Sequence, residues 1–161
     1  MILNIVILAL VTLQRLGELW LANRNTRRLL AQGARERGAG HYPLIVAVHT
    51  LWLLSLWWLA LPRPVHLFWL ALFVLIEVAR VWVLMTLGAR WTTRIIVLPQ
   101  APLVGRGPYR LVNHPNYLVV IGEIAVLPLV FGLWQVALVF TLLNAAVLTV
   151  RIREENRALG R

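Results

Sequence analysis

Long apolar stretches dominate the sequence and constrain its fold more than any other feature. A helix needs about 20 residues to cross the roughly 30 Å hydrocarbon layer of a bilayer, and stretches of this length are typical of membrane spans. Five apolar stretches cover residues 2–22, 44–61, 65–87, 117–131 and 133–150, of which the second reaches this length only marginally. Hydrophobic residues make up 60% of the chain, more than is usual in a soluble domain. The sequence therefore predicts an all-α integral membrane protein with five transmembrane helices.

Prolines and a glycine mark the breaks between these stretches. Pro62 and Pro64 separate the second from the third, because a proline inside a helix removes a backbone hydrogen bond and clashes with the preceding turn. The fourth and fifth stretches are joined only around Gly132, which predicts a tight helical hairpin. The first stretch is expected to be a retained span and not a cleaved signal peptide, since Arg15 and Glu18 lie inside it.

The charged residues orient the chain in the membrane. The 16 basic residues are all Arg, the 6 acidic residues are all Glu, and the net charge is +10. Arginines gather in residues 23–42, in residues 88–116 and after residue 150, which all lie on one side if there are five spans. The positive-inside rule then places the N-terminus outside and the C-terminus in the cytoplasm, in the inner (cytoplasmic) membrane of the cell. An anionic membrane surface explains this charge better than a nucleic-acid partner.

The length supports one domain, residues 1–161. We expect three N-terminal spans in residues 1–90, and a cofactor-binding loop, a helical hairpin and a tail in residues 91–161. The basic loop 23–42 is expected on the membrane surface, either as a determinant of topology or as a gate for substrate. Trp20 and Trp91 are expected near the cytoplasmic interface. Cysteine is absent, which excludes disulfides and thiolate metal sites, and no metal is expected.

The connector of residues 88–116 is the first candidate for a functional site. A connector of this length in a compact helical protein is usually functional or disordered, and its apolar residues and prolines indicate that it packs. Gly105, Gly107 and Pro108 predict a tight turn before Tyr109, where the backbone can approach a ligand such as an adenine or a ribose closely. A turn that binds no ligand is the alternative.

The connector ends at a predicted helix start. His114 precedes Pro115 and is therefore held out of the α region, while Pro115 suits the first helical turn. Asn113 or His114 is a candidate cap. The rings of His114 and Tyr117 are expected to face the cytoplasmic mouth of the hairpin, and a plain helix start with an interfacial aromatic is the alternative.

The C-terminal segment combines arginines with two adjacent glutamates. Arg151 and Glu155 are four residues apart, so they share one face of a helix. Together they could bind a ligand with a negative part and a positive or hydroxylated part. A stop-transfer signal explains the arginines but not the pair of Glu154 and Glu155.

Ionisable residues inside the predicted spans are costly and are usually paired or functional. Arg15 with Glu18, and Glu77 with Arg80, are spaced for pairs within one helix. Glu123 has no arginine at helical spacing on its own helix. It is expected to be a structural partner of Arg80 or Arg15, or else a catalytic group.

These motifs resemble those of the isoprenylcysteine carboxyl methyltransferases and their bacterial relatives. The matching elements are Leu103-Val104-x-x-Gly107-x-Tyr109, His114-Pro115-x-Tyr117, a helical hairpin and Arg151-x-x-Glu154-Glu155, in the family's order and spacing. The resemblance implies a cytoplasm-facing site for S-adenosylmethionine. The cofactor contacts that it implies are Ala101, Pro102, Leu103, Val104, Tyr109, His114, Pro115, Asn116, Tyr117 and Glu155. It places Arg151 on the substrate side, where it can pair with a carboxylate.

The resemblance also suggests the kind of methyl acceptor. Asn113 stands where the eukaryotic enzymes have Arg, and the sequence stops at Arg161 where they continue. The run of residues 90–94 (Arg-Trp-Thr-Thr-Arg), the run His114-Pro115-Asn116-Tyr117 and Glu123 together resemble a small bacterial branch. Some members of that branch are similar to O-methyltransferases of alkylpyrones and phenolic lipids. The acceptor is therefore expected to be a lipophilic small molecule with a carboxyl, phenolic or enolic hydroxyl group, which reaches the site from the membrane lipids.

The predicted function is S-adenosylmethionine-dependent methyl transfer to this acceptor. Arg151 would stabilise an acceptor anion, and His114 or Glu123 would serve as a base if the acceptor is a less acidic phenol. Two other classes remain open. One is a non-catalytic membrane protein, such as a transporter subunit or an assembly factor, that uses the connector as a partner-binding surface. The other is a lipid reductase that uses NADPH.

Overall fold

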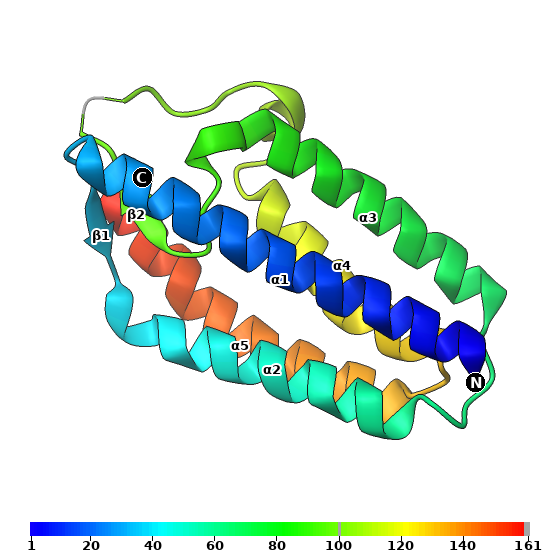
Figure 1. Cartoon of the computed structure of the whole chain (residues 1–161). Helices are drawn as coiled ribbons and strands as arrows, with labels where there is room; N and C mark the ends of the chain where they lie inside the picture. The colour runs from blue at the N-terminus through cyan, green and yellow to red at the C-terminus, as the bar shows by residue number, and fades with distance from the viewer. Residues whose placement is uncertain (100, 160–161) are drawn as a thin grey trace.

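The computed structural model of the protein describes residues 1–99 and 101–159, and this part of the chain folds into a bundle of five α-helices. They are α1 (Ile2–Ala31), α2 (Tyr42–Leu59), α3 (Leu67–Leu87), α4 (Pro115–Val130) and α5 (Trp134–Leu159). Successive helices run in opposite directions along the bundle (Figure 1). The prediction of a helical fold is confirmed.

Four of these helices, α1, α2, α3 and α5, are long and apolar enough to cross a membrane. The remaining helix, α4, has 16 residues, or about 24 Å at 1.5 Å per residue, which is less than the hydrocarbon layer. It packs against both α3 and α5, and more than half of its residues are buried. The bundle has the helix lengths and composition of an integral membrane protein, and the count of five spans stays a prediction.

Two of the breaks between the helices lie where the sequence predicted them. The segment that holds Pro62 and Pro64 separates α2 from α3. Gly132 has a φ of +68°, a conformation that favours glycine, and it joins α4 to α5 as a tight hairpin. The backbone N–H of His66 donates to the carbonyl of Val130 at 2.8 Å, which ties the two turns together at this end of the bundle.

Two helices extend further than the apolar pattern predicted. The first continues past residue 22 to Ala31, so that Arg24, Arg27 and Arg28 are helical and not part of a loop. The last continues past residue 150 to Leu159. Arginine, leucine and glutamate are good helix formers, so a helix can run on after its apolar face ends. The prediction that residue 22 ends the first helix was wrong for this reason.

A short β-ribbon was not predicted. Strand β1 (Arg35–Arg37) pairs in antiparallel register with β2 (Ile95–Val97), with Glu36 opposite Ile96. Strands of three residues are too short to give a recognisable alternation of apolar and polar residues. The ribbon joins the basic segment after α1 to the connector between α3 and α4, so this part of the segment is bound to the protein.

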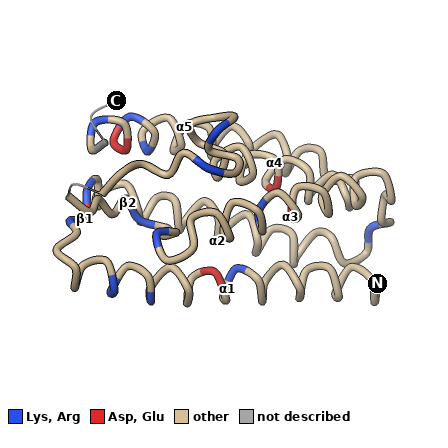
Figure 2. The backbone as a smooth tube through the Cα atoms, turned by 90° about the horizontal axis from the view of Figure 1, so that it is seen from above, with Lys and Arg blue, Asp and Glu red and all other residues tan. Residues whose placement is uncertain are grey.

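Most of the arginines gather at one end of the bundle, where β1, β2 and the end of α5 lie (Figure 2). The three basic segments predicted to share one side of the membrane therefore share one end of the fold. Arg161, the last arginine of the predicted basic tail, lies outside the described residues. The assignment of this end to the cytoplasm stays a prediction from the positive-inside rule.

A cluster of charges lies inside the apolar bundle. Arg15 of α1 binds Glu18 at 3.0 Å and Glu123 of α4 at 2.7 Å. Arg80 of α3 binds Glu18 at 3.1 Å and makes a second ion pair with Glu123, whose side chain is fully buried. The Arg15–Glu18 pair was predicted, as was the pairing of Glu123 with arginines of other helices.

The predicted pair of Glu77 with Arg80 was wrong. Glu77 instead accepts a hydrogen bond from the side-chain amide of Gln14 at 2.6 Å. Arg80 is 3% exposed and points into the bundle, where Glu18 and Glu123 already hold it. Spacing along one helix shows which residues are neighbours there, but not that another helix offers a closer carboxylate.

We expect Glu123→Gln to destabilise the protein by about 3–5 kcal/mol, because it leaves two buried arginines short of a compensating carboxylate. Thermal unfolding in detergent measures this change. Glu77→Gln is the matched control and should have a much smaller effect, since Gln14 can still bind the amide oxygen. Equal stability of the Glu123→Gln protein and the wild type would contradict a structural role, and loss of activity at unchanged stability would support the catalytic alternative.

Candidate functional site

The rings of two aromatic side chains and a guanidinium meet at the arginine-rich end of the bundle. The hydroxyl of Tyr117 on α4 accepts a hydrogen bond from Arg151 Nε of α5 at 2.8 Å, and it donates to Glu155 Oε2. The His114 ring stacks on the Tyr117 ring, with centroids 5.3 Å apart and planes 18° apart. His114 Nε2 donates to Asn156 Oδ1 at 3.2 Å. Residues that are distant in sequence thus form one polar group, to which sequence reasoning did not assign Asn156.

The start of α4 and the residue spacing on α5 position these side chains. Pro115 is the first residue of α4 and His114 is its N-cap, but the His114 side chain makes no capping hydrogen bond. Its ring is used instead to contact α5. On α5, Arg151 and Glu155 are one helical turn apart, and both bind the same hydroxyl of Tyr117.

The connector between α3 and α4 encloses a cavity of about 360 Å³ beside this group. The cavity is within the size range of small-molecule sites. It is lined by Ala101, Pro102, Leu103, Val104, Tyr109, His114, Asn116, Tyr117 and Glu155 among the residues for which a cofactor contact was predicted. Pro115 does not line it and is buried at the start of α4. Arg151 also lines this cavity.

The walls of this first cavity combine one carboxylate with several cations and an apolar surface. Glu155 is the carboxylate in the described lining, and Arg90, Arg94 and Arg151 are the cations. Arg90 Nη1 donates to the backbone carbonyl of Pro102 at 2.6 Å, which fixes the connector over the cavity. Such a cavity suits a ligand that has a positive centre, a negative carboxylate and a flat apolar part.

The turn before Tyr109 forms as the sequence predicted. Gly107 has a φ of +58° and begins a short 3-10 helix, Gly107–Arg110. Burial raises the pKa of the Tyr109 hydroxyl well above its usual value, and the nearby carboxylate of Glu155 raises it further. Tyr109 therefore stays protonated at neutral pH and presents a hydrogen-bond donor to the cavity.

Sequence reasoning missed two residues that hold the connector in place. The Asn25 side-chain amide donates to the backbone carbonyls of Trp91 at 2.8 Å and Gly88 at 3.2 Å. Trp91 Nε1 in turn donates to Asn116 Oδ1 at 3.3 Å. Trp91 is 3% exposed, so it packs inside the protein, and its depth near the cytoplasmic interface stays a prediction. A buried polar residue on the helical extension of α1 is recognisable only once that extension is known.

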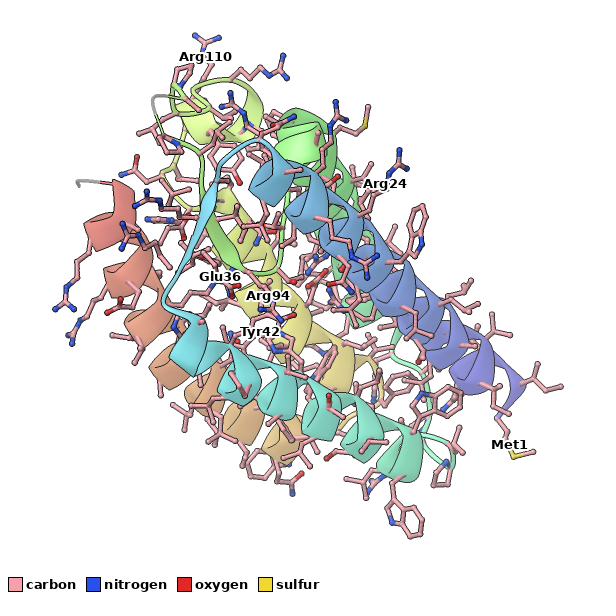
Figure 3. All side chains as sticks on the ribbon, turned by 60° about the vertical axis from the view of Figure 1, so that its left-hand side comes forward. Met1, Arg24, Glu36, Tyr42, Arg94 and Arg110 are labelled. Carbon is pink, nitrogen blue, oxygen red and sulfur yellow. The ribbon has the colours of Figure 1, made fainter. Side chains whose placement is uncertain are left out.

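Glu36, Tyr42 and Arg94 link the β-ribbon to the start of α2, as Figure 3 shows. Arg94 Nη1 binds both carboxylate oxygens of Glu36, at 2.9 and 3.1 Å, and its guanidinium lies 4.6 Å from the centroid of the Tyr42 ring. The Tyr42 hydroxyl lies 3.1 Å from Thr93 Oγ1. These contacts hold β1 and the N-terminus of α2 against the connector.

A second cavity, of about 460 Å³, lies between α1 and α2 inside the bundle. Its lining is mostly apolar and includes Leu16, Leu53 and Trp57. The two cavities share five residues at their junction, namely Trp91, Thr92, Asn116, Tyr117 and Arg151. The polar group around Tyr117 therefore lies between a mixed cavity and an apolar one.

Glu123 is the one predicted catalytic candidate that lies away from this junction. Its carboxylate is fully buried between Arg15 and Arg80, and it lines neither cavity. This position favours the structural alternative for Glu123, while His114 and Arg151 both lie at the first cavity.

We expect Gly107→Ala to destabilise the connector. A Cβ at Gly107 would lie 2.5 Å from Thr86 Oγ1, and its positive φ costs a residue with a side chain about 1–2 kcal/mol. Faster limited proteolysis within the connector is the expected readout. Gly105→Ala is the control, since a Cβ there meets nothing within 4 Å. Equal protease resistance of both variants would contradict this account of the turn.

Comparison with known proteins gives two matches. The model of the isoprenylcysteine carboxyl methyltransferase (ICMT) family matches residues 69–161, which include α4, α5 and the whole connector. The uncharacterized protein YpbQ of Bacillus subtilis (strain 168) is 37% identical over 166 residues, which cover 95% of this chain and 94% of YpbQ. No solved structure matches the chain.

Proposed function

The chain belongs to the isoprenylcysteine carboxyl methyltransferase family, and from this premise we propose that it is an S-adenosylmethionine-dependent methyltransferase of a lipophilic acceptor. Its four long apolar helices and its family make it an integral membrane protein. The proposal places the site at the cytoplasmic face of the inner membrane. The observation that carries the proposal is the junction at Tyr117 and Arg151, where a mixed cavity meets an apolar one.

The first cavity has the chemistry that S-adenosylmethionine requires. This cofactor carries a methyl group on a sulfonium sulfur. The bond between the methyl carbon and the sulfur breaks as a bond between that carbon and the acceptor oxygen forms, and the sulfur keeps the electron pair. Glu155 offers the carboxylate that suits a positive centre or a ribose diol, and Arg90 suits the carboxylate of the cofactor. The apolar side chains of Ile95 and Leu98 suit its adenine.

The second cavity suits the acceptor. A lipophilic molecule can leave the bilayer between α1 and α2 and bury its apolar part against the side chains there. Its reactive oxygen would then lie at the junction, next to the first cavity. Alignment of donor and acceptor accounts for much of the rate of an in-line displacement, so two cavities that meet at one point favour this reaction.

Arg151 is positioned to bind the acceptor oxygen. Its Nε is held by the Tyr117 hydroxyl, while Nη1 and Nη2 have no hydrogen-bond partner within residues 1–99 and 101–159. Neither nitrogen is sealed from solvent, so both can stabilise negative charge on a carboxylate or an enolate. A phenol would also need a base, and His114 of the first cavity is the candidate that the geometry favours.

We expect Glu155→Gln to weaken the binding of S-adenosylmethionine about tenfold, because a hydrogen bond to a charged group is worth about 1.5–3 kcal/mol. Calorimetry on the purified protein in detergent measures this affinity. Glu154→Gln is the matched control, since Glu154 binds Arg157 at 3.0 Å and does not line the cavity. Unchanged affinity of the Glu155→Gln protein would contradict the assignment, and binding of NADPH in place of S-adenosylmethionine would favour the reductase.

We expect Arg151→Ala to leave the cofactor affinity within a few-fold of wild type but to reduce methyl transfer about a hundredfold, because the acceptor anion is then no longer bound and aligned for the in-line displacement. Transfer of a labelled methyl group to a long-chain fatty acid and to a long-chain alkylphenol tests both acceptor classes. Arg153→Ala is the control, because Arg153 is an exposed neighbour that lines neither cavity. Parallel loss of cofactor binding and transfer would argue against a role on the acceptor side.

A further inference from the structure

A histidine lies in the wall of the apolar second cavity. His49 of α2 is half-buried and lines this cavity. Its Nδ1 lies 2.8 Å from the backbone carbonyl of Ile45, one helical turn earlier. A carbonyl oxygen can only accept, so Nδ1–H is the donor. In the neutral ring the other nitrogen, Nε2, then carries a lone pair and acts only as an acceptor.

Several of the other polar groups of this wall bind within the protein, whereas Trp52 Nε1 and Arg15 Nε are donors that are sealed from solvent without a partner among the described residues. The Thr12 hydroxyl donates to the carbonyl of Leu8 at 2.7 Å and accepts from Trp57 Nε1 at 3.0 Å. The charged groups of Arg15 and Arg80 are compensated by the carboxylates of the buried cluster. The cavity therefore offers no unpaired charge at this depth.

His49 Nε2 is different from these groups. It has no hydrogen-bond partner in the described part of the chain, and it is not among the buried polar atoms that lack one. The nitrogen is thus accessible, and the cavity that His49 lines is the space next to it. An acceptor facing an apolar space is costly to leave unpaired when a lipid displaces water from it.

We propose that the lipid in this cavity carries a hydroxyl group that donates a hydrogen bond to His49 Nε2. This inference rests on the proposed function, because it concerns the acceptor that occupies the cavity, and it names the class of acceptor more closely. A ketone, an ether or a carboxylate would place a lone pair against that of Nε2. Among the oxygen groups of lipids, a free O–H supplies the proton that the site needs.

The depth of His49 separates this hydroxyl from the oxygen that is methylated. His49 is seven residues beyond Tyr42, or about 10 Å along the helix, and Tyr42 lies at the arginine-rich end next to Thr93. The hydroxyl therefore lies within the apolar body of the lipid, while the head group is at Arg151. The structure assigns to the cavity a long-chain amphiphile that is hydroxylated along its chain.

The test compares lipids that differ only at this position. The probes are stearate, a hydroxystearate with its hydroxyl near the middle of the chain, and the corresponding ketostearate, each titrated against the full-length protein in nanodiscs. The wild type should bind hydroxystearate about fivefold more tightly than either of the other two, as expected for one net hydrogen bond. His49→Leu should abolish the preference. His49→Gln should restore part of it, because its amide oxygen is again an acceptor.

Thr50→Val is the matched control. Thr50 is the next residue of α2, is exposed and lines the same cavity, so this variant should keep the full preference. All proteins are compared in the same nanodiscs. Differences in how the probes partition into lipid are therefore the same for each protein, and they cancel when the preference of a variant is divided by that of the wild type. Thermal unfolding of each variant identifies any that has lost its fold, and the His49→Gln protein then decides the result.

Equal binding of the three probes by the wild type overturns the proposal, as does a preference that persists in His49→Leu. Failure of hydroxystearate to bind also overturns it. Calorimetry with S-adenosylmethionine on the same samples separates this result from the proposed function. Cofactor binding without a hydroxyl preference refutes only the role of His49, whereas absence of cofactor binding refutes the methyltransferase itself.

Discussion

The ion-pair cluster inside the bundle is the interaction on which the arrangement of the helices depends. Arg15 of α1 and Arg80 of α3 share the carboxylates of Glu18 and Glu123, and Glu123 comes from α4. Uncompensated charges at membrane depth are costly, so these three helices can approach only in a register that brings the four groups together. This register fixes α1 as one wall of the apolar cavity and holds α4, which begins at the junction of the two cavities.

The junction itself is built from groups that depend on one another. Arg151 and Glu155 lie one turn apart on α5, and the hydroxyl of Tyr117 binds both. The tyrosine thereby keeps the guanidinium and the carboxylate apart, so that each can face a different ligand. The stacked ring of His114 limits the positions open to Tyr117. A methyltransferase of two unlike substrates needs such a fixed boundary, because its rate depends on alignment.

Much of the fold follows from local patterns in the sequence. The apolar stretches predicted the helices, Gly132 predicted the hairpin, and the glycines before Tyr109 predicted the turn, since each of these features depends on the residues within its own segment. Nine of the ten residues predicted to contact a cofactor line the first cavity, but they were predicted from family motifs and not from physics. Partners across helices were harder to predict. Glu77 binds Gln14 and not Arg80, because the choice between two partners depends on how helices face each other.

The sequence by itself determined that this chain has long apolar helices, that they break at the prolines and at Gly132, and that its three basic segments lie together at one end. These properties are set by the residues of each segment and by their distance along the chain. Only the tertiary structure decided that Trp91 is buried against Asn116 and that the β-ribbon joins two connectors. It also decided that Tyr117 lies between two cavities. Each of these contacts joins segments far apart in the sequence, and the packing of the helices brings them together.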